Sequence, residues 1–254
     1  MQLNYERQGT GEPIILIHGL FGDLDNLKSI SRSLTDSYTV INLDVRNHGQ
    51  SPHCDDMDYA DMAADVVAVA DAEGFDSFHL LGHSMGGKIA MEIALRHPRR
   101  VRSLMVADIA PVAYDARHSS IIDALSSINV EQLESRAQAD AQLADSIETK
   151  GVRQFLLKNL RKDGDHWFWR FNLPALRNNY EALIGAPTSE GQYTGPVIFI
   201  RGEHSDYVTE AHTDAIATRF PRATPKTIKG TGHWLHAEKP TEFNQLVCDF
   251  LEQH

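Results

Sequence analysis

Short, continuously apolar runs alternate along the chain with segments in which apolar residues recur every three or four positions. Five runs are rich in Ile, Val and Leu and end at polar residues or Gly, which is the pattern of buried strands. They lie at residues 13–17, 38–43, 78–81, 104–107 and 197–200. Residues 59–70 and 243–251 each carry one apolar face at the helical period. Buried strands that alternate with helices predict a mostly parallel α/β sheet with helices on both faces.

One long segment breaks this alternation. Residues 115–183 show helical patterns without a clear strand, and they follow an apolar run that ends at Ala107. An insertion at the end of such a strand lies where ligands bind in open α/β sheets. We therefore expect a core domain of residues 1–114 and 184–254, and a helical cap of residues 115–183 over an active site. The alternative is a helical layer on one face of the sheet.

Composition and charge narrow the classes of function. The 254 residues are 42% hydrophobic and 23% charged, as in ordinary globular proteins. The formal net charge of −11 disfavours general binding to nucleic acid. The sequence shows no signal peptide and no apolar run of membrane length, and its two cysteines, Cys54 and Cys248, suit a reducing compartment. We expect a cytoplasmic protein without a membrane span.

The segment Gly82-His83-Ser84-Met85-Gly86 fits the pattern G-x-S-x-G of a nucleophile elbow. It directly follows the predicted strand 78–81 and precedes a helical pattern, which is the strand–turn–helix context that the motif requires. The tight turn would expose the Ser84 hydroxyl, and the helix would direct its N–H groups at developing negative charge. The alternative is a serine that caps a helix between two packing glycines. We expect His83 to pack rather than to act as a base.

Acyl transfer also needs two backbone N–H donors for the oxyanion, and a base. After a nucleophile elbow, one donor is the next residue, Met85, and the other comes from the loop that follows the first predicted strand. In that loop Leu20 is the expected donor and Phe21 the alternate. The base should be a late loop histidine, and His233 follows the last predicted strand between glycine and tryptophan. His236 could join it at a metal, but no third ligand is evident, so we expect neither metal nor cofactor.

Five blocks of sequence carry a resemblance that is more specific than the elbow. They are 18–22 (HGLFG), 44–51 (DVRNHGQS), 82–88 (GHSMGGK), 107–112 (ADIAPV) and 232–240 (GHWLHAEKP). Together they resemble the α/β-hydrolase superfamily and, within it, small bacterial esterases of the YbfF type. The resemblance spans the chain outside the cap. It implies the α/β-hydrolase fold with an eight-stranded, mostly parallel sheet, and esterase activity on short acyl chains, with acyl-CoA thioesters as a further substrate class.

Two carboxylates compete for the third place of a Ser-His-acid triad. Most superfamily members place the acid in the turn after the strand that follows the cap, where this chain has Ser205 at the usual position and Asp206 one residue later. Asp108 closes the strand before the cap, where a buried carboxylate needs a partner, and the resemblance also points to it. We favour Asp108 and keep Asp206 open. Ser205 is then a supporting hydrogen-bond partner of His233 or Asp108.

The cap also supplies candidates for the substrate pocket. Pockets for small molecules are mainly apolar and aromatic, and the second half of the cap is rich in such side chains. We expect Phe155 and Trp169 of the cap to line the pocket with Phe21 and Trp234 of the core.

Charge is unevenly divided within the cap. Residues 115–148 hold seven acidic and two basic side chains, whereas residues 150–177 hold seven basic and two acidic ones. Either the two halves pair with each other, or the second half forms a basic rim that attracts an anionic ester or a CoA phosphate.

The sequence thus predicts a carboxylesterase that acts on a small-molecule ester or thioester through an acyl-enzyme, with Ser84, His233 and Asp108 as the triad. The same triad could hydrolyse carbon–carbon bonds, and nothing in the sequence separates the two reactions. A third hypothesis is a hydrolase fold without catalysis that binds a ligand, against which the intact triad speaks. Serine rather than aspartate at position 84 disfavours haloalkane dehalogenation.

Overall fold

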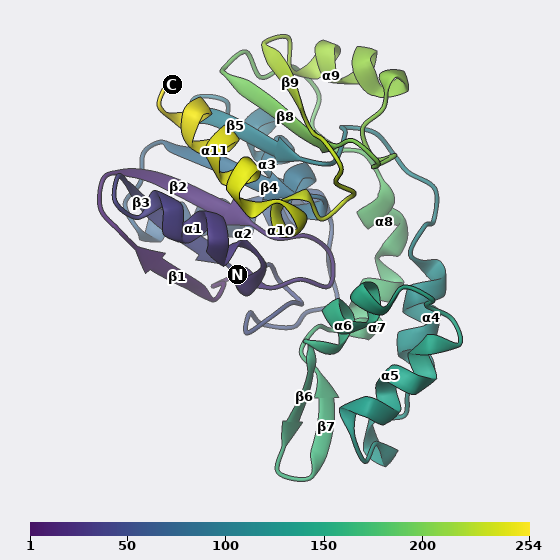
Figure 1. Cartoon of the computed structure of the whole chain (residues 1–254). Helices are drawn as coiled ribbons and strands as arrows, with labels where there is room; N and C mark the ends of the chain where they lie inside the picture. The colour runs from purple at the N-terminus through teal and green to yellow at the C-terminus, as the bar shows by residue number, and fades with distance from the viewer.

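A seven-stranded sheet forms the centre of the computed structural model, which describes residues 1–254 (Figure 1). Its strands are β1 (Tyr5–Gln8), β2 (Glu12–Ile17), β3 (Tyr38–Leu43), β4 (Phe78–His83), β5 (Val101–Ala107), β8 (Val197–Gly202) and β9 (Ala223–Ile228). They lie in the order β1-β3-β2-β4-β5-β8-β9, and only β1 runs antiparallel to its neighbour. The predicted α/β-hydrolase architecture is confirmed, with seven strands where eight were expected. Residues 1–4 contact the loop after β3, through Asn4, and add no strand.

Helices cover both faces of this sheet. They are η1 (Leu24–Leu27), α1 (Lys28–Leu34), α2 (Tyr59–Ala72), α3 (Met85–Arg96), η3 (Glu210–His212), α9 (Thr213–Arg219), α10 (Leu235–Glu238) and α11 (Pro240–Leu251). Along β2, Ile14 and Leu16 pack in one apolar core with α1 and α11, whereas Ile15 and Ile17 pack in another with α2 and α3. Because both faces of the strand are buried, its sequence is continuously apolar.

Between β5 and β8 the chain forms a group of elements set off from the sheet (Figure 1). They are α4 (Ser119–Ser127), η2 (Val130–Gln132), α5 (Arg136–Ala144), α6 (Lys150–Leu157), β6 (Leu160–Asp163), β7 (His166–Trp169), α7 (Leu173–Asn178) and α8 (Tyr180–Ile184). The prediction that this segment is wholly helical is wrong, because β6 and β7 pair as an antiparallel hairpin. Gly164 supplies the left-handed conformation (φ 56°) that such a two-residue turn requires.

Ion pairs join the two halves of the 115–183 segment. Arg153 Nε lies 2.8 Å from Asp140 Oδ1, and the same guanidinium donates to the carbonyls of Ile147 and Glu148. Arg177 of the basic half likewise forms an ion pair with Asp123 of the acidic half. Lys158 and Arg161 form no ion pair, so cross-pairing accounts for only part of the basic half.

Two further observations concern the chain as a whole. None of its helices combines the length and the apolar composition that a bilayer crossing requires. Cys54 and Cys248 are both free thiols, each partly buried.

A buried glutamate binds the stretch of chain that leads from the 115–183 segment back to β8. Glu92 of α3 is fully buried, and its carboxylate accepts hydrogen bonds from the N–H groups of Thr188 (2.6 Å) and Ser189 (3.2 Å) and from both of their hydroxyls. Arg96 Nε donates to the same carboxylate at 2.6 Å. Burial by itself raises the pKa of Glu92, but these hydrogen bonds outweigh it and lower the pKa below its usual value.

We therefore expect Glu92→Gln to destabilise the protein, because an amide group would face two N–H donors in place of a carboxylate oxygen. Losing charge-assisted hydrogen bonds in a buried site costs about 1.5–3 kcal/mol, which lowers the Tm of a chain of this size by roughly 3–10 °C. The difference from wild type should shrink in acid, since a carboxylate with a lowered pKa stabilises the fold above its unfolded pKa and loses that effect on protonation. Thermal melting at pH 7 and in acid, with the exposed Glu190→Gln as control, measures both effects. Equal melting of the two variants at pH 7 would contradict this assignment.

Candidate active site

Ser84 stands on a strained turn between β4 and α3. Its backbone has φ 54° and ψ −120°, a combination that non-glycine residues rarely adopt. Two glycines allow α3 to approach β4 and the end of β2 closely. A Cβ on Gly82 would lie 2.1 Å from the carbonyl oxygen of Gly86, and a Cβ on Gly86 would lie 2.1 Å from that of Ile17. The elbow therefore depends on glycine at both positions.

A continuous chain of hydrogen bonds links Ser84 to a buried carboxylate. His233, on the loop between β9 and α10, lies with Nε2 2.9 Å from Ser84 Oγ and with Nδ1 2.7 Å from Asp108 Oδ2. When Nδ1–H donates to the carboxylate, Nε2 is left to accept the Ser84 proton. The structure thus brings together the three side chains that the sequence analysis proposed as a triad.

Asp108 and Asp206 have contrasting surroundings. Asp108 is fully buried (0% exposed), adopts a positive φ of 52°, and accepts hydrogen bonds from the Gly202 N–H (3.0 Å) and the Ser205 hydroxyl as well as from His233. The side chain of Asp206 is 74% exposed and forms an ion pair with Arg117 at 2.6 Å. Asp206 makes no hydrogen bond with His233, and Ser205 binds Asp108 rather than His233.

Two aromatic rings hold His233 in place. His83 Nε2–H donates to the carbonyl oxygen of His233 at 2.8 Å, so His83 does more than pack. Burial lowers the pKa of His83 well below its usual value, and the neighbouring His236 and His233 add to the effect, so the ring is neutral near pH 7. The Tyr207 ring stacks on the imidazole of His233 with 4.0 Å between the ring centroids and 24° between the planes.

Two buried histidines shape the loop that was expected to supply an oxyanion donor. His48 Nδ1–H donates to the Arg46 carbonyl, which leaves Nε2 to accept the Phe21 N–H at 3.1 Å. Burial, with the nearby His18, lowers the pKa of His48 to about 3, so it is neutral. Because the N–H of Phe21 is occupied, Leu20 is the better donor, and its N–H makes no hydrogen bond within the protein.

His18 also holds this loop in place through hydrogen bonds. Its Nδ1–H donates to the Gly19 carbonyl, and its Nε2 accepts the N–H of Val45 at 3.0 Å. Asn159, just past α6, holds the loop from the other side by donating to the Phe21 carbonyl at 2.7 Å. Met85 is the first residue of α3, and its N–H likewise donates no hydrogen bond in a turn, loop or cap.

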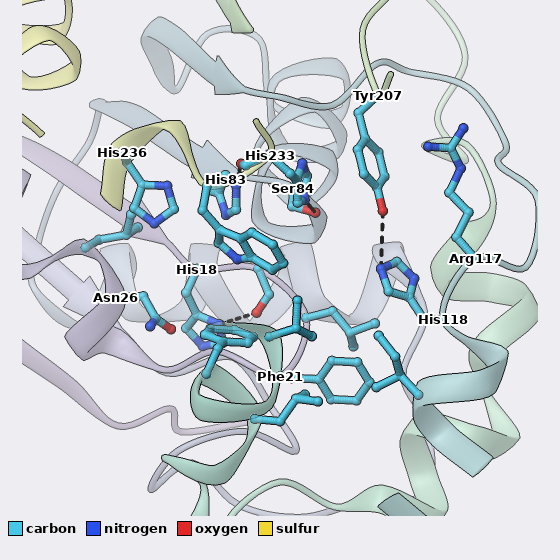
Figure 2. A pocket seen from close by; sticks show the side chains of 18 residues that line it. His18, Phe21, Asn26, His83, Ser84, Arg117, His118, Tyr207, His233 and His236 are labelled. Carbon is cyan, nitrogen blue, oxygen red and sulfur yellow. Dashed lines mark hydrogen bonds between the residues drawn. The ribbon is translucent and has the colours of Figure 1, made fainter. Parts of the chain in front are cut away.

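A cavity of about 290 Å³ opens onto Ser84 and His233, as Figure 2 shows. Phe21, Phe155 and Trp234 line it, as expected. Trp169 does not, and its prediction as a pocket residue is wrong. The ring of Trp169 lies on the hairpin strand β7 and stacks on Phe171 at 5.2 Å, which keeps it out of the cavity.

A wider cleft of about 650 Å³ continues from this cavity and shares Phe155 and Trp234 with it. Arg136, Lys158 and Arg161 line the cleft without ion-pair partners. Three acidic residues also line it, namely Asp23, Asp25 and Glu238, and the first two already face Arg170 and Lys28. The chain has no cluster of three or more His, Cys, Asp or Glu residues that could hold a metal ion.

The sequence analysis missed His118 and Tyr207. Both line the cavity, and Figure 2 shows them side by side, joined by a hydrogen bond of 3.2 Å between His118 Nε2 and the Tyr207 hydroxyl. Burial, with the nearby His233 and Arg117, lowers the pKa of His118 to about 4. Tyr207 follows Ser205 in a turn that the sequence had already marked, whereas His118 carries no local signal.

Comparisons with known proteins agree with this geometry. A family model described as alpha/beta hydrolase fold matches residues 12–172. Esterase YbfF of Escherichia coli (strain K12) is 40% identical over 247 residues, covering 97% of this chain and 95% of that protein. The sn-1-specific diacylglycerol lipase ABHD11 of Mus musculus is 36% identical over 246 residues, covering 94% of this chain and 80% of that one. A solved structure named marine microorganism esterase has a TM-score of 0.95 at 39% identity, covering 98% of this chain and 99% of its own.

The surroundings of the two aspartates predict that Asp108→Asn lowers ester hydrolysis far more than Asp206→Asn. Asparagine at position 108 would favour the wrong tautomer of His233, an effect of about 10⁴-fold in kcat in serine hydrolases. Asp206→Asn should remove only an exposed ion pair, with less than about tenfold effect. Steady-state kinetics of both purified variants on one activated ester provide the comparison. A larger loss at Asp206 would contradict the assignment of Asp108.

Because several histidines are buried, we expect the free energy of unfolding to fall in acid. Burial, with the neighbouring His233, lowers the pKa of His236 to about 4, below the usual 6.5. The unfolded chain then binds the proton more tightly, so this contribution to stability is complete above about pH 6.5 and falls as the pH drops towards 4, by up to about 3 kcal/mol. We expect His236→Gln to reduce the slope of urea-unfolding stability against pH between 6.5 and 4. The exposed His204→Gln serves as control, and equal slopes for the three proteins would refute the prediction.

Proposed function

From the premise that the chain belongs to the α/β-hydrolase family, as a carboxylic ester hydrolase of the YbfF type, we propose that it hydrolyses short-chain acyl esters through an acyl-enzyme. The observation that carries the proposal is the chain of hydrogen bonds from Ser84 through His233 to Asp108, at the end of a cavity. This arrangement is the general one for nucleophilic acyl transfer by serine.

In the first half of the reaction, Ser84 Oγ attacks the ester carbonyl carbon while His233 Nε2 takes the hydroxyl proton. Asp108 holds the imidazole in the tautomer that accepts this proton and stabilises the imidazolium that results. The tetrahedral intermediate then collapses. The bond to the leaving oxygen breaks, His233 returns the proton to that oxygen, and an alcohol leaves an acyl group on Ser84.

The N–H groups of Leu20 and Met85 would stabilise the oxyanion in both halves of the reaction. Neither group is engaged in the protein's turn or loop hydrogen bonds, so neither must break a bond to receive the oxyanion. In the second half, water takes the place of the alcohol, gives a proton to His233 and attacks the acyl carbon. The bond from that carbon to Ser84 Oγ then breaks, His233 returns the proton to Oγ, and a carboxylic acid leaves.

We further propose that residues 115–183 act as a cap on a core of residues 1–114 and 184–254. His118, Ile121 and Phe155 of this segment line the cavity beside Ser84, and Asn159 binds the loop that carries Leu20. The free basic side chains of the outer cleft extend the proposal to thioesters whose leaving group bears phosphates, as in acyl-CoA.

This proposal predicts that Ser84→Ala and His233→Ala each lower kcat by about 10⁴-fold or more with little change in melting, because nucleophile and base act as a unit. The assay is a series of p-nitrophenyl esters, with acetyl-CoA alongside at low and high salt. Hydrolysis of acetyl-CoA should weaken as salt screens the outer cleft, while that of neutral esters should not. Retention of more than about a tenth of the activity by either folded variant would overturn the mechanism.

A further inference from the structure

Two separate cavities open onto Ser84, and they differ in which parts of the machinery they include. The larger one, of about 290 Å³, is lined by Ser84 and His233. The smaller one, of about 40 Å³, is lined by Ser84 and Met85 but not by His233. The two spaces adjoin at the residues that line both: Leu20, Ser84, Arg117, His118 and Tyr207.

The chemistry of acyl transfer places one part of the substrate on each side of Ser84. The tetrahedral carbon carries Ser84 Oγ, the oxyanion, the leaving oxygen and the acyl chain. His233 must protonate the leaving oxygen, which therefore has to lie within hydrogen-bond reach of Nε2. The leaving group consequently belongs in the cavity that His233 lines, and the acyl chain is directed to the opposite side, into the smaller cavity.

The smaller cavity admits only a short chain. At about 40 Å³, against about 290 Å³ for the larger cavity, it offers the acyl chain much less room. We therefore expect it to accept acyl groups of acetyl to butyryl length. The larger cavity, by contrast, has room for a bulky alcohol between the side chains of Phe21, Ile121, Phe155 and Leu156.

Hydrogen bonds join residues of the smaller cavity's lining to one another. The Tyr59 hydroxyl donates to the Leu183 carbonyl at 2.7 Å, and the Tyr114 hydroxyl donates to the Tyr207 carbonyl at 2.5 Å. Because these hydroxyls are engaged elsewhere, the two tyrosines offer mainly their rings to a ligand.

The one ammonium group that lines the smaller cavity, that of Lys88, is also engaged in hydrogen bonds. Lys88 Nζ donates to the carbonyls of Ile184 (3.1 Å) and Gly185, and it lies 4.8 Å from the centre of the Tyr114 ring. Burial lowers the pKa of Lys88 to about 7, which further weakens it as a partner for an anion. The other charged groups that line the cavity are Arg117, which pairs with Asp206, and the carboxylate of Asp115, which would repel an anion. The cavity therefore suits a neutral alkyl chain better than an acyl group that carries a carboxylate.

We propose that the smaller cavity is the acyl subsite and the larger cavity the leaving-group subsite, so that the enzyme selects acetyl to butyryl esters of bulky apolar alcohols. This assignment rests on the proposed function of Ser84 and His233. It makes Leu183, which lines only the smaller cavity, a residue that determines acyl-chain length, and Leu156, which lines only the larger one, a residue that determines the leaving group.

The test is a two-way series of esters measured as kcat/KM. One arm keeps p-nitrophenol and lengthens the acyl chain from acetyl to octanoyl. The other keeps acetyl and enlarges the leaving group from phenol to 1-naphthol, two alcohols of similar acidity. In wild type we expect a fall of at least about tenfold between butyryl and octanoyl, since each methylene that does not fit costs about tenfold or more. We expect no comparable fall when the alcohol is enlarged. A flat acyl series would overturn the assignment.

The matched variants are Leu183→Ala and Leu156→Ala, the same change at two buried leucines of the 115–183 segment. Leu183→Ala should raise the hexanoyl-to-acetyl ratio of kcat/KM about tenfold, and Leu183→Phe should lower it. Leu156→Ala should leave that ratio unchanged and alter the dependence on alcohol size. Because each ratio is taken within one enzyme, a partly unfolded preparation cannot mimic the result.

Either of two outcomes would refute the subsites. One is a change in the acyl ratio from Leu156→Ala and not from Leu183→Ala, and the other is no change from either. Ser84→Ala, run in parallel, separates this failure from that of the proposed function. If wild type hydrolyses the esters and Ser84→Ala does not, the reaction stands and only the placement of the substrate is wrong.

Discussion

The burial of the Asp108 carboxylate is the constraint on which the site depends. A fully buried carboxylate is tolerated only when hydrogen-bond donors surround it, and here the donors come from the end of β8, from the turn after it and from the loop after β9. These donors reach Asp108 because β5 and β8 are neighbours in the sheet, with the Asp108 N–H bound to the Ile200 carbonyl at 2.8 Å. The strand order thus determines which loops can meet at the carboxylate. The same carboxylate orients the His233 ring. It thereby also orients the hydrogen bond between His233 and Ser84.

Neutral histidines provide much of the remaining order around Ser84. His18, His48 and His83 are buried, and burial is the main reason why the pKa of each is lowered. A neutral imidazole has one donor nitrogen and one acceptor nitrogen, so it can join two backbone groups in a defined direction. His48 does so between Arg46 and Phe21, and its occupation of the Phe21 N–H leaves Leu20 as the free donor of the loop. An apolar residue could fill the same volume but could not hold those backbone groups.

The sequence predicted the features that are local or that follow from strand order. The elbow around Ser84 and the loop histidine His233 could be located because each follows a recognisable strand, and the sheet then brings the ends of those strands together. The hairpin was not predicted although Asp163-Gly164 is a turn signal, because residues 115–183 were expected to form a helical cap. That error also misplaced Trp169 in the pocket. His118 and Tyr207 could not be paired from sequence, since they are 89 residues apart and meet only when the 115–183 segment lies over the core.

The hydrogen bond from Asn159 to the Phe21 carbonyl has a consequence for how modular such proteins can be. It joins residues 138 positions apart, one in the 115–183 segment and one in the loop beside Ser84. A hybrid that received the whole 115–183 segment of another hydrolase would keep its own Ser84, His233 and Asp108, yet it would lose this tether unless the donor segment offered an amide at the same place. Segments of this kind are therefore not freely interchangeable, because compatibility between donor and host includes a partner for the Phe21 carbonyl as well as the shape of the pocket.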